Sequence, residues 1–303
     1  MEMQGKVYSI RGNTSIIKAE DDKFYKGILK SSLPRTNESI LAVGDIVEIY
    51  IVDEETAHIV NVLPRKNKIA RPDPHDKEKI LVMASNIDQI LLISSFKNPD
   101  FNPGFIDRFL LYSFREDIEP ILVINKYDLV DVVPESVKIY QQEFDVLFVS
   151  AETGMNLDLL KEKIIGRTSL LAGASGVGKS TIINKLFPGI NVKVDKKNVK
   201  IVKGRHVTSY TTIYELDKNT LIIDSPGIRK IKMDMMDPLE VQWYFPEIDR
   251  LSHYCKFSNC LHLSEPECAV RTAVKNGEIS QLRYSSYLRI LNEILNYIKN
   301  KGV

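Results

Sequence analysis

The chain has 303 residues, a formal net charge of +1, 44% hydrophobic residues and 27% charged residues. This length predicts two or three globular domains, and the balanced charge means that only local charge can indicate a nucleic-acid partner. No apolar run approaches the roughly 18 residues that a bilayer crossing needs, and the first residues, MEMQGKVYSIRGN, lack the apolar core of a signal peptide. We therefore expect a cytoplasmic protein without a membrane partner.

The first 63 residues predict a small β-barrel. Short stretches of strand-forming residues are separated by Gly, Asn and Asp, and no long helical pattern interrupts them. These strands are expected at residues 6–10, 14–19, 23–28, 46–51 and 57–62. About five short strands suit an OB-fold, and the pattern alone does not separate it from an SH3-like barrel. We assign an OB-like barrel to residues 1–70, and the basic linker PRKNKIAR follows its last strand at residues 64–71.

From about residue 80 the pattern changes to apolar strands that alternate with helices. Strands are expected at residues 90–93, 121–124, 146–149, 169–172 and 221–223, and helices include residues 105–114 and 157–165. This alternation implies a largely parallel sheet that is covered by helices. We assign residues 71–235 to this α/β domain.

A guanine-reading motif, NKYD, occupies residues 125–128 directly after a buried strand. The Asp carboxylate accepts hydrogen bonds from guanine N1–H and from the 2-amino group. Adenine would leave the carboxylate unpaired, at a cost on the order of 1–3 kcal/mol or more. The dipeptide SA that ends the next strand matches the second base-contacting motif. The predicted base-binding residues are Asn125, Lys126, Asp128, Ser150 and Ala151.

A phosphate-binding loop follows at residues 173–180, where GASGVGKS is a complete G-x4-G-K-S match between an apolar strand and a helix. Its glycines let backbone N–H groups turn toward the β-phosphate. Lys179 would reach the β and γ oxygens and act in catalysis, and the Ser180 hydroxyl would bind Mg²⁺. The predicted nucleotide-binding residues here are Gly173, Ala174, Ser175, Gly176, Val177, Gly178, Lys179, Ser180 and Thr181.

The motif DSPG at residues 224–227 completes the set and reveals a circular permutation. Asp224 is expected to hold the Mg²⁺ shell, and the Gly227 N–H can approach a γ-phosphate. Ordinary small GTPases place the P-loop first and the base-reading motifs last, whereas this chain reverses that order. Permutation moves chain ends without moving strands. DSPG is the expected switch II element, and because it then leads directly into the C-terminal domain, we expect nucleotide state to move that domain as a lever.

Switch I is expected at residues 192–212, which hold six Lys and Arg residues against one Asp. Such a run is either a solvated face or a flexible loop that meets phosphate from nucleotide or RNA. Thr208 is the candidate for the threonine that completes Mg²⁺ coordination, with Thr211 and Thr212 as rivals. Ile228 stands where many GTPases carry a water-orienting glutamine, so His206 is the candidate catalytic residue.

The C-terminal region, residues 236–303, contains all three cysteines of the chain and ends in a helix with leucines at near-helical spacing. Three thiols and one imidazole lie within 14 residues. In a reducing compartment this cluster favours metal binding over disulfides, and its ligand set suits a closed, structural Zn²⁺ site. The predicted zinc ligands are Cys255, Cys260, His262 and Cys268.

Taken together, these features closely resemble the bacterial ribosome small-subunit-dependent GTPase A family over nearly the whole chain. The resemblance is carried by the barrel, the order NKYD–SA–GASGVGKS–DSPG, and the segments GRH, FPEI, CKFSNCLHLSEPEC and RYSSYL. It implies GTP hydrolysis stimulated by the 30S subunit, a role in late 30S maturation, 16S rRNA contacts from the barrel and one structural zinc. It also places the family's switch I histidine at His206.

Two departures from the family pattern are visible. The family's GRHTTT reads GRHVTS here, which keeps Thr208 but changes both of its neighbours, and Glu267 stands where Gly is common. We expect a monomer that binds GTP and GDP with Mg²⁺.

The sequence is compatible with three candidate functions. The first is a GTPase acting on the small ribosomal subunit. The second is an RNA-binding module whose nucleotide domain senses GDP or (p)ppGpp with little turnover. The third, a kinase or ATPase, is disfavoured by Asn125 and Asp128.

Overall fold

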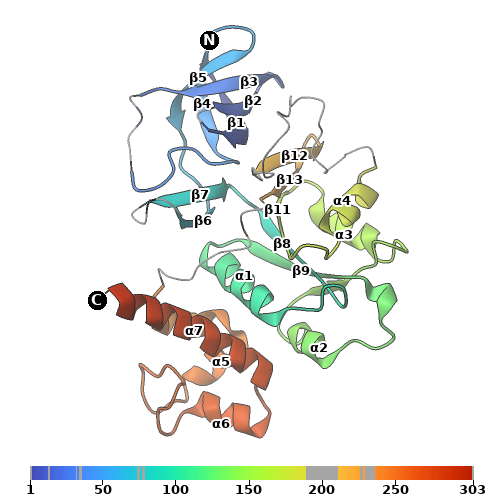
Figure 1. Cartoon of the computed structure of the whole chain (residues 1–303), viewed down its shortest axis with the longest axis vertical. Helices are drawn as coiled ribbons and strands as arrows, with labels where there is room; N and C mark the ends of the chain where they lie inside the picture. Colours follow the sequence, from blue (N-terminus) through green and yellow to red (C-terminus); the bar gives the residue numbers. More distant parts are fainter. Residues whose placement is uncertain are drawn as a thin grey trace, which may run out of the picture.

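A computed structural model describes the chain except for residues 1, 13, 32, 34–35, 74–75, 77–78, 189–210, 226–227, 229–235 and 302–303. Figure 1 shows a β-barrel at one end, a helix-covered sheet in the middle and a helical region at the other end. None of the helices in these described ranges has the length and apolar character that a membrane crossing requires.

The N-terminal part is a closed five-stranded barrel. Its strands are β1 (Glu2–Arg11), β2 (Thr14–Ala19), β3 (Phe24–Leu29), β4 (Ile46–Ile51) and β5 (Thr56–Val62). They pair in the order β1-β2-β3-β5-β4, and β4 closes back on β1. β3 and β5 run parallel, whereas the other barrel pairs are antiparallel. This Greek-key order is that of an OB-fold, which settles the choice against an SH3-like barrel.

Alternating side chains fill the barrel because successive residues of a strand point to opposite faces. Inward residues such as Val7, Ile17 and Ile49 are fully buried. All five predicted strands are present, and β1 begins earlier than predicted.

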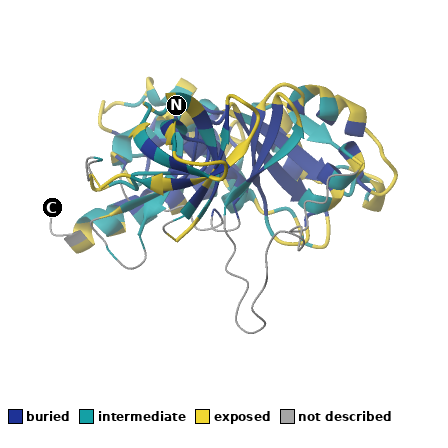
Figure 2. Cartoon of the chain, turned by 90° about the horizontal axis from the view of Figure 1, so that it is seen from above, coloured by how far each residue is buried: buried dark blue, intermediate teal, exposed yellow. Residues whose placement is uncertain are grey.

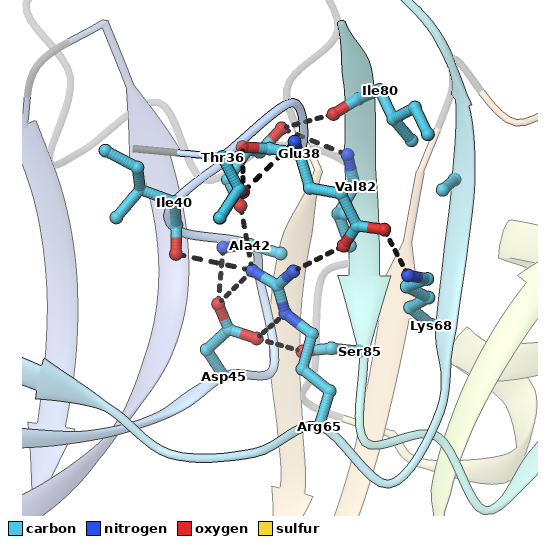
Figure 3. A network of polar contacts seen from close by, with 12 residues as sticks. Thr36, Glu38, Ile40, Ala42, Asp45, Arg65, Lys68, Ile80, Val82 and Ser85 are labelled. Atoms are coloured by element: carbon cyan, nitrogen blue, oxygen red, sulfur yellow. Dashed lines mark hydrogen bonds and ion pairs between the residues drawn. The ribbon is translucent and has the colours of Figure 1, made fainter. Parts of the chain in front are cut away.

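A hairpin that was not predicted, β6 (Lys68–Pro72) and β7 (Ile80–Ser85), follows the barrel. Figure 3 shows the polar network that joins this hairpin to the barrel. The buried carboxylate of Asp45, in the loop before β4, accepts from Arg65 Nε at 2.8 Å and from Ser85 Oγ at 2.6 Å. The predicted basic linker is therefore anchored at Arg65, since a buried carboxylate needs such partners.

The central sheet contains β8 (Gln89–Ser95), β9 (Glu119–Asn125), β10 (Val146–Phe148), β11 (Thr168–Ala172), β12 (Thr212–Asp217) and β13 (Thr220–Asp224). Its order is β10-β9-β8-β11-β13-β12, in which only β12, among these strands, runs antiparallel to its neighbour β13. The predicted parallel sheet is thus confirmed, and β12 is an addition. The sheet continues through β12 into β1 of the barrel.

Both faces of this sheet are buried, which explains the near-continuous apolar strands; Figure 2 shows buried strands in the interior of the molecule and exposed residues at its periphery. Ile90 and Leu92 of β8 join a core with α1 (Pro103–Arg115) and α2 (Glu135–Gln141). Their neighbours in the strand join a second core with α3 (Leu157–Ile164) and α4 (Lys179–Leu186). The parallel strands end at one edge, and all the predicted nucleotide motifs follow those ends.

The C-terminal region consists of η4 (Pro238–Tyr244), α5 (Pro246–Ser252), α6 (Ala269–Asn276) and α7 (Gln281–Lys301). α7 lies along α1, as Figure 1 shows. The contact contains a buried ion-pair cluster in which Arg283 of α7 faces Asp107 of α1 and Glu247 of α5. The helical region is therefore fixed to the α1 side of the central sheet.

Candidate nucleotide and metal sites

The P-loop joins the end of β11 to the start of α4. Two of its glycines are required because the structure leaves no room for a Cβ atom at their positions. A Cβ at Gly173 would lie 2.2 Å from the carbonyl oxygen of Ile93, and a Cβ at Gly178, whose φ is +98°, would lie 2.2 Å from Asn125 Nδ2. The loop therefore packs directly on β8 and on the NKYD motif, where no larger residue fits.

The Lys179 ammonium lies over this loop and donates to the carbonyl oxygens of Gly173 at 2.9 Å and Ala174 at 2.8 Å. α4 begins at Lys179, so the helix N-terminus points at the same loop. A helix start with its unpaired N–H groups is a favourable environment for phosphate.

A pocket of about 340 Å³ opens beside the loop. It brings Ser180, the predicted Mg²⁺ ligand of the P-loop, together with Asp224, the predicted ligand at the end of β13. A hydroxyl and a carboxylate are oxygen ligands of the kind that Mg²⁺ prefers. The pocket is lined by Leu171, Gly173, Ser175, Gly176, Gly178, Lys179, Ser180, Thr181, Asp224, Ser225 and Ile228.

Asn125 connects the base-reading loops to the P-loop. Its side chain is buried, its Nδ2 donates to the carbonyl oxygen of Val177 at 2.8 Å, and its Oδ1 accepts from the backbone N–H of Ala151 at 2.9 Å. The Asn of the predicted motif therefore holds three loops in register. The sequence predicted it as a base-binding residue, and the structure gives it this bridging position as well.

Lys126 and Asp128 stand at the open edge of the same site. Lys126 adopts a left-handed conformation with φ 64°, and its Nζ donates to the carbonyl oxygens of Asn98 and Gly176, the latter at 2.8 Å. The exposed Asp128 accepts from the buried Ser150 hydroxyl at 2.5 Å. That bond fixes the orientation of the carboxylate that is proposed to read guanine.

Three predicted site residues, His206, Thr208 and Gly227, lie outside the described residues. The rival threonines Thr211 and Thr212 are described. Thr211 Oγ1 lies 2.8 Å from Ser225 Oγ, beside the pocket.

Two features of the site were missed from the sequence. The first is the Thr211–Ser225 contact, for which the sequence contains no local signal. The second is the loop after β8, whose Asn98 receives Lys126. The second could have been found, because any loop at the carboxyl end of a parallel strand faces the ligand edge.

The four predicted zinc ligands meet in the C-terminal region. Their ligand atoms all lie within 4.8 Å of one another, and His262, Cys260 and Cys268 are buried. His262 Nδ1 is 3.4 Å from Cys268 Sγ and 3.6 Å from Cys255 Sγ. These separations fit the corners of a tetrahedron around Zn²⁺, since Zn–S bonds are about 2.3 Å and Zn–N bonds about 2.0–2.1 Å.

Two hydrogen bonds outside the four ligand atoms orient the histidine of this cluster. His262 Nε2 lies 2.8 Å from Gln242 Oε1, and the backbone oxygen of His262 accepts from Tyr284 OH at 2.6 Å. If Nε2–H donates to Gln242, Nδ1 is left free to bind metal, as is usual for such ligands. Burial lowers the pKa of His262 to about 4, so the imidazole is neutral near pH 7. The cluster therefore fits one structural Zn²⁺.

A match to a known protein family decides which family the chain belongs to. Residues 62–234 match the family model described as RsgA GTPase. This chain belongs to the RsgA GTPase family. It is therefore a GTP hydrolase, which works on GTP with Mg²⁺, and the predicted resemblance is confirmed.

Relatives and solved structures agree with this assignment. The chain is 37% identical to "Small ribosomal subunit biogenesis GTPase RsgA" of Christiangramia forsetii, over 95% of this chain and 96% of the relative. It is 36% identical to the protein of the same name from Thermotoga maritima, over 84% and 83% of the two chains.

Two solved structures resemble the whole fold. YjeQ from Thermotoga maritima matches with a TM-score of 0.76 and 31% identity, over 97% of this chain and 99% of that chain. YloQ, a circularly permuted GTPase, matches with a TM-score of 0.70 and 26% identity, over 98% and 96%. The predicted fold class, a barrel, a permuted GTPase domain and a helical region with a zinc-type cluster, is confirmed.

Proposed function

We propose that this protein is a GTPase that binds the small ribosomal subunit and assists its late maturation, with hydrolysis stimulated by the subunit. The observation that carries the proposal is the joining of a guanine-type nucleotide site to an OB barrel and a zinc-type cluster in one permuted chain. The relatives named for small ribosomal subunit biogenesis support the choice of partner. We assign the three domains to residues 1–70, 71–235 and 236–303.

The proposed roles follow from the site geometry and the sequence motifs. Asp128 reads guanine, with Ser150 holding its carboxylate. Lys179 binds the β and γ phosphates, and Ser180 and Asp224 hold Mg²⁺ in their shared pocket. We assign Thr208 to Mg²⁺ and His206 to the attacking water on sequence alone.

The barrel is the proposed contact with 16S rRNA. Residues of β2 and β3 alternate between the barrel interior and an outer face, and that outer face carries Phe24, which is 52% exposed, beside Lys18 and Lys26. An exposed aromatic ring with lysines on these strands of an OB-fold suits stacked bases and phosphates. We further propose a cytoplasmic monomer without a membrane partner.

A nucleotide-sensing RNA-binding module remains the second candidate, and Ile228 is the observation that favours it. Its side chain is buried in the core and also lines the phosphate pocket. An apolar group there cannot orient water, so the free chain should turn over slowly. Substantial turnover on subunits would decide against this candidate.

Binding tests the choice of partner. The full chain is sedimented with purified 30S or 50S subunits in the presence of GDP or a non-hydrolysable GTP analogue. We expect co-sedimentation with 30S subunits that is stronger with the GTP analogue. Equal binding to both subunits, or none to 30S, would remove the small subunit as the specific partner.

A further inference from the structure

β12 connects the barrel to the nucleotide pocket. It begins at Thr212, the last residue of predicted switch I, and Thr212 pairs with Ser9 of the barrel on one side. On its other side Thr212 pairs with Asp224 of β13. Figure 1 shows β12 lying beside β1. β12 therefore begins at the end of switch I, pairs with the barrel on one side and pairs on the other with the strand residue Asp224, the proposed Mg²⁺ ligand.

Three side chains strengthen the barrel side of this junction. Lys18 Nζ of β2 donates to both carboxylate oxygens of Glu215 in β12, each at 2.8 Å, and Tyr8 OH of β1 donates to Oε2 at 3.1 Å. The Lys18 and Glu215 side chains are only 17% and 26% exposed. The ion pair is thus partly shielded from water and stronger than a fully exposed pair.

The other end of the strand reaches the pocket. Thr211, just before β12, makes its 2.8 Å contact with the buried hydroxyl of Ser225, which directly follows Asp224. Ser225 and Asp224 both line the phosphate pocket. A displacement of β12 would reach these groups, because Thr212 pairs with Asp224 and Thr211 contacts Ser225 directly.

The same lysine also borders the proposed RNA surface. Lys18 Nζ lies 5.9 Å from the centre of the exposed Phe24 ring, and that ring packs edge-on against Tyr8 at 5.3 Å between centroids. A nucleotide base or phosphate on this part of the barrel would therefore contact the side chains that hold Glu215.

We propose that Lys18 and Tyr8 are positioning residues for GTP hydrolysis. Through Glu215 they hold β12, and with it the end of switch I, in a position set by the barrel. RNA contact at the barrel is transmitted to the nucleotide pocket along this strand. The inference rests on the proposed function, because the reaction concerned is hydrolysis stimulated by the small subunit.

The first experiment measures kcat and KM for GTP with 30S subunits for full-length Glu215→Gln and Lys18→Met variants. Stimulated kcat should fall about fivefold or more, which is within the usual range of coupling energies, while KM for GTP changes little. Exchanging the charges with Lys18→Glu and Glu215→Lys in one chain should recover part of the lost kcat. A merely structural role would lower stability without this split between kcat and KM.

Glu48→Gln is the matched control. Glu48 lies on β4 and accepts from Asn61 at 3.1 Å within the exposed face of the barrel. This substitution removes one carboxylate charge, as Glu215→Gln does, but from the barrel and without touching β12, so stimulated kcat should stay unchanged. If Glu215→Gln behaves like Glu48→Gln, the inference is overturned.

A second measurement separates this inference from the proposed function. Amide hydrogen exchange of residues 212–217 is followed in the free, unmodified chain and in the Glu215→Gln and Glu48→Gln variants. Faster exchange in Glu215→Gln alone supports the junction between β12 and the barrel. This holds even if 30S subunits fail to stimulate the unmodified chain, because that failure would contradict only the proposed function. Unchanged exchange in Glu215→Gln would overturn the inference whatever the subunits do.

Discussion

The docking of the C-terminal region depends on one buried arginine, and replacing it gives a sharp prediction. Arg283 is 3% exposed, and its Nε donates to Glu247 at 2.6 Å. Its Nη1 donates to the fully buried Asp107, which also accepts from Tyr140 OH at 2.8 Å. The guanidinium carbon lies 4.7 Å from the centre of the Phe245 ring. One cation thus compensates two carboxylates.

The perturbation is Arg283→Met, which keeps the length of the side chain and removes its charge. Removing one partner of a buried ion pair typically costs about 3–5 kcal/mol, because the remaining charge stays buried and uncompensated. We expect a loss of that size in the free energy of unfolding near pH 7. Urea titration followed by Trp243 fluorescence is the assay, since Trp243 is the single tryptophan and lies in η4.

The pH dependence of that loss has a defined sign. Burial raises the pKa of Asp107, although the Arg283 guanidinium opposes the rise. Because the folded-state pKa of Asp107 lies above its unfolded-state pKa, ionisation of this carboxyl destabilises the folded state. This destabilisation is absent below the unfolded-state pKa and fully present above the folded-state pKa. The pKa should rise further in the Arg283→Met variant. Its stability loss should therefore shrink as the pH falls toward the ordinary Asp range.

Arg250→Met is the matched control. Arg250 makes two hydrogen bonds to Glu143, at 2.8 and 2.6 Å, but its side chain is 61% exposed. Glu143 is only 15% exposed, but the solvent-facing arginine keeps the pair close to the exposed class, which contributes about 0–1 kcal/mol, so this variant should lose much less stability than Arg283→Met. Equal losses in the two variants would refute the structural role of Arg283, as would a loss under about 1 kcal/mol in Arg283→Met with zinc content unchanged.

Three further predictions concern the sites. Asp128→Asn should weaken GTP binding by on the order of 1–3 kcal/mol and shift the nucleotide preference toward xanthine. Competition titration measures both effects. Equal affinities of the unmodified chain for ATP and GTP would contradict the guanine assignment. Cys260→Ala should abolish stoichiometric zinc binding and destabilise the C-terminal region, because the free energy of metal binding contributes to folding. Metal analysis of chelator-free protein measures the zinc content. Less than one zinc per unmodified chain would count against the predicted zinc site. His206→Ala should lower 30S-stimulated turnover about 10²–10⁴-fold with near-normal nucleotide affinity, whereas full turnover would make His206 an ordinary loop residue.

Much of the nucleotide site could be predicted because its chemistry resides in consecutive residues. GASGVGKS and NKYD each carry their geometry within one loop, and the strand before each loop fixes where it lies. Contacts between loops could not be predicted in this way. The bridge from Asn125 to Val177 and Ala151 joins residues 52 and 26 positions apart, and it depends on which strands become neighbours.

The C-terminal helix shows a different limit. Leucine spacing correctly predicted α7, but leucines make up only part of its buried face. Leu282, Leu288 and Leu295 are only partly buried, whereas Leu291 is fully buried together with Tyr287 and Ile294. The buried face also contains Arg283, which a pattern of apolar residues would place in solvent. Its partners come from α1 and α5, so only the tertiary fold reveals why an arginine is stable there.

The barrel was predicted as a fold but not as a neighbour of the active site. Its five strands follow from alternating residues and turn signals, while the pairing of Ser9 with Thr212 has no local signature. Edge pairing between two domains depends on how both sheets end. The same limit applies to the Lys18–Glu215 pair, whose members lie 197 residues apart.

The most direct test of the proposed function is the steady-state rate of GTP hydrolysis by the full chain, measured alone and with saturating purified 30S subunits, with 50S subunits as the control. We expect slow hydrolysis by the free chain, because Ile228 presents no polar group to the pocket, and a large increase in kcat with 30S subunits only. The same low rate with and without 30S subunits, or equal stimulation by 50S subunits, would contradict a GTPase that acts on the small ribosomal subunit.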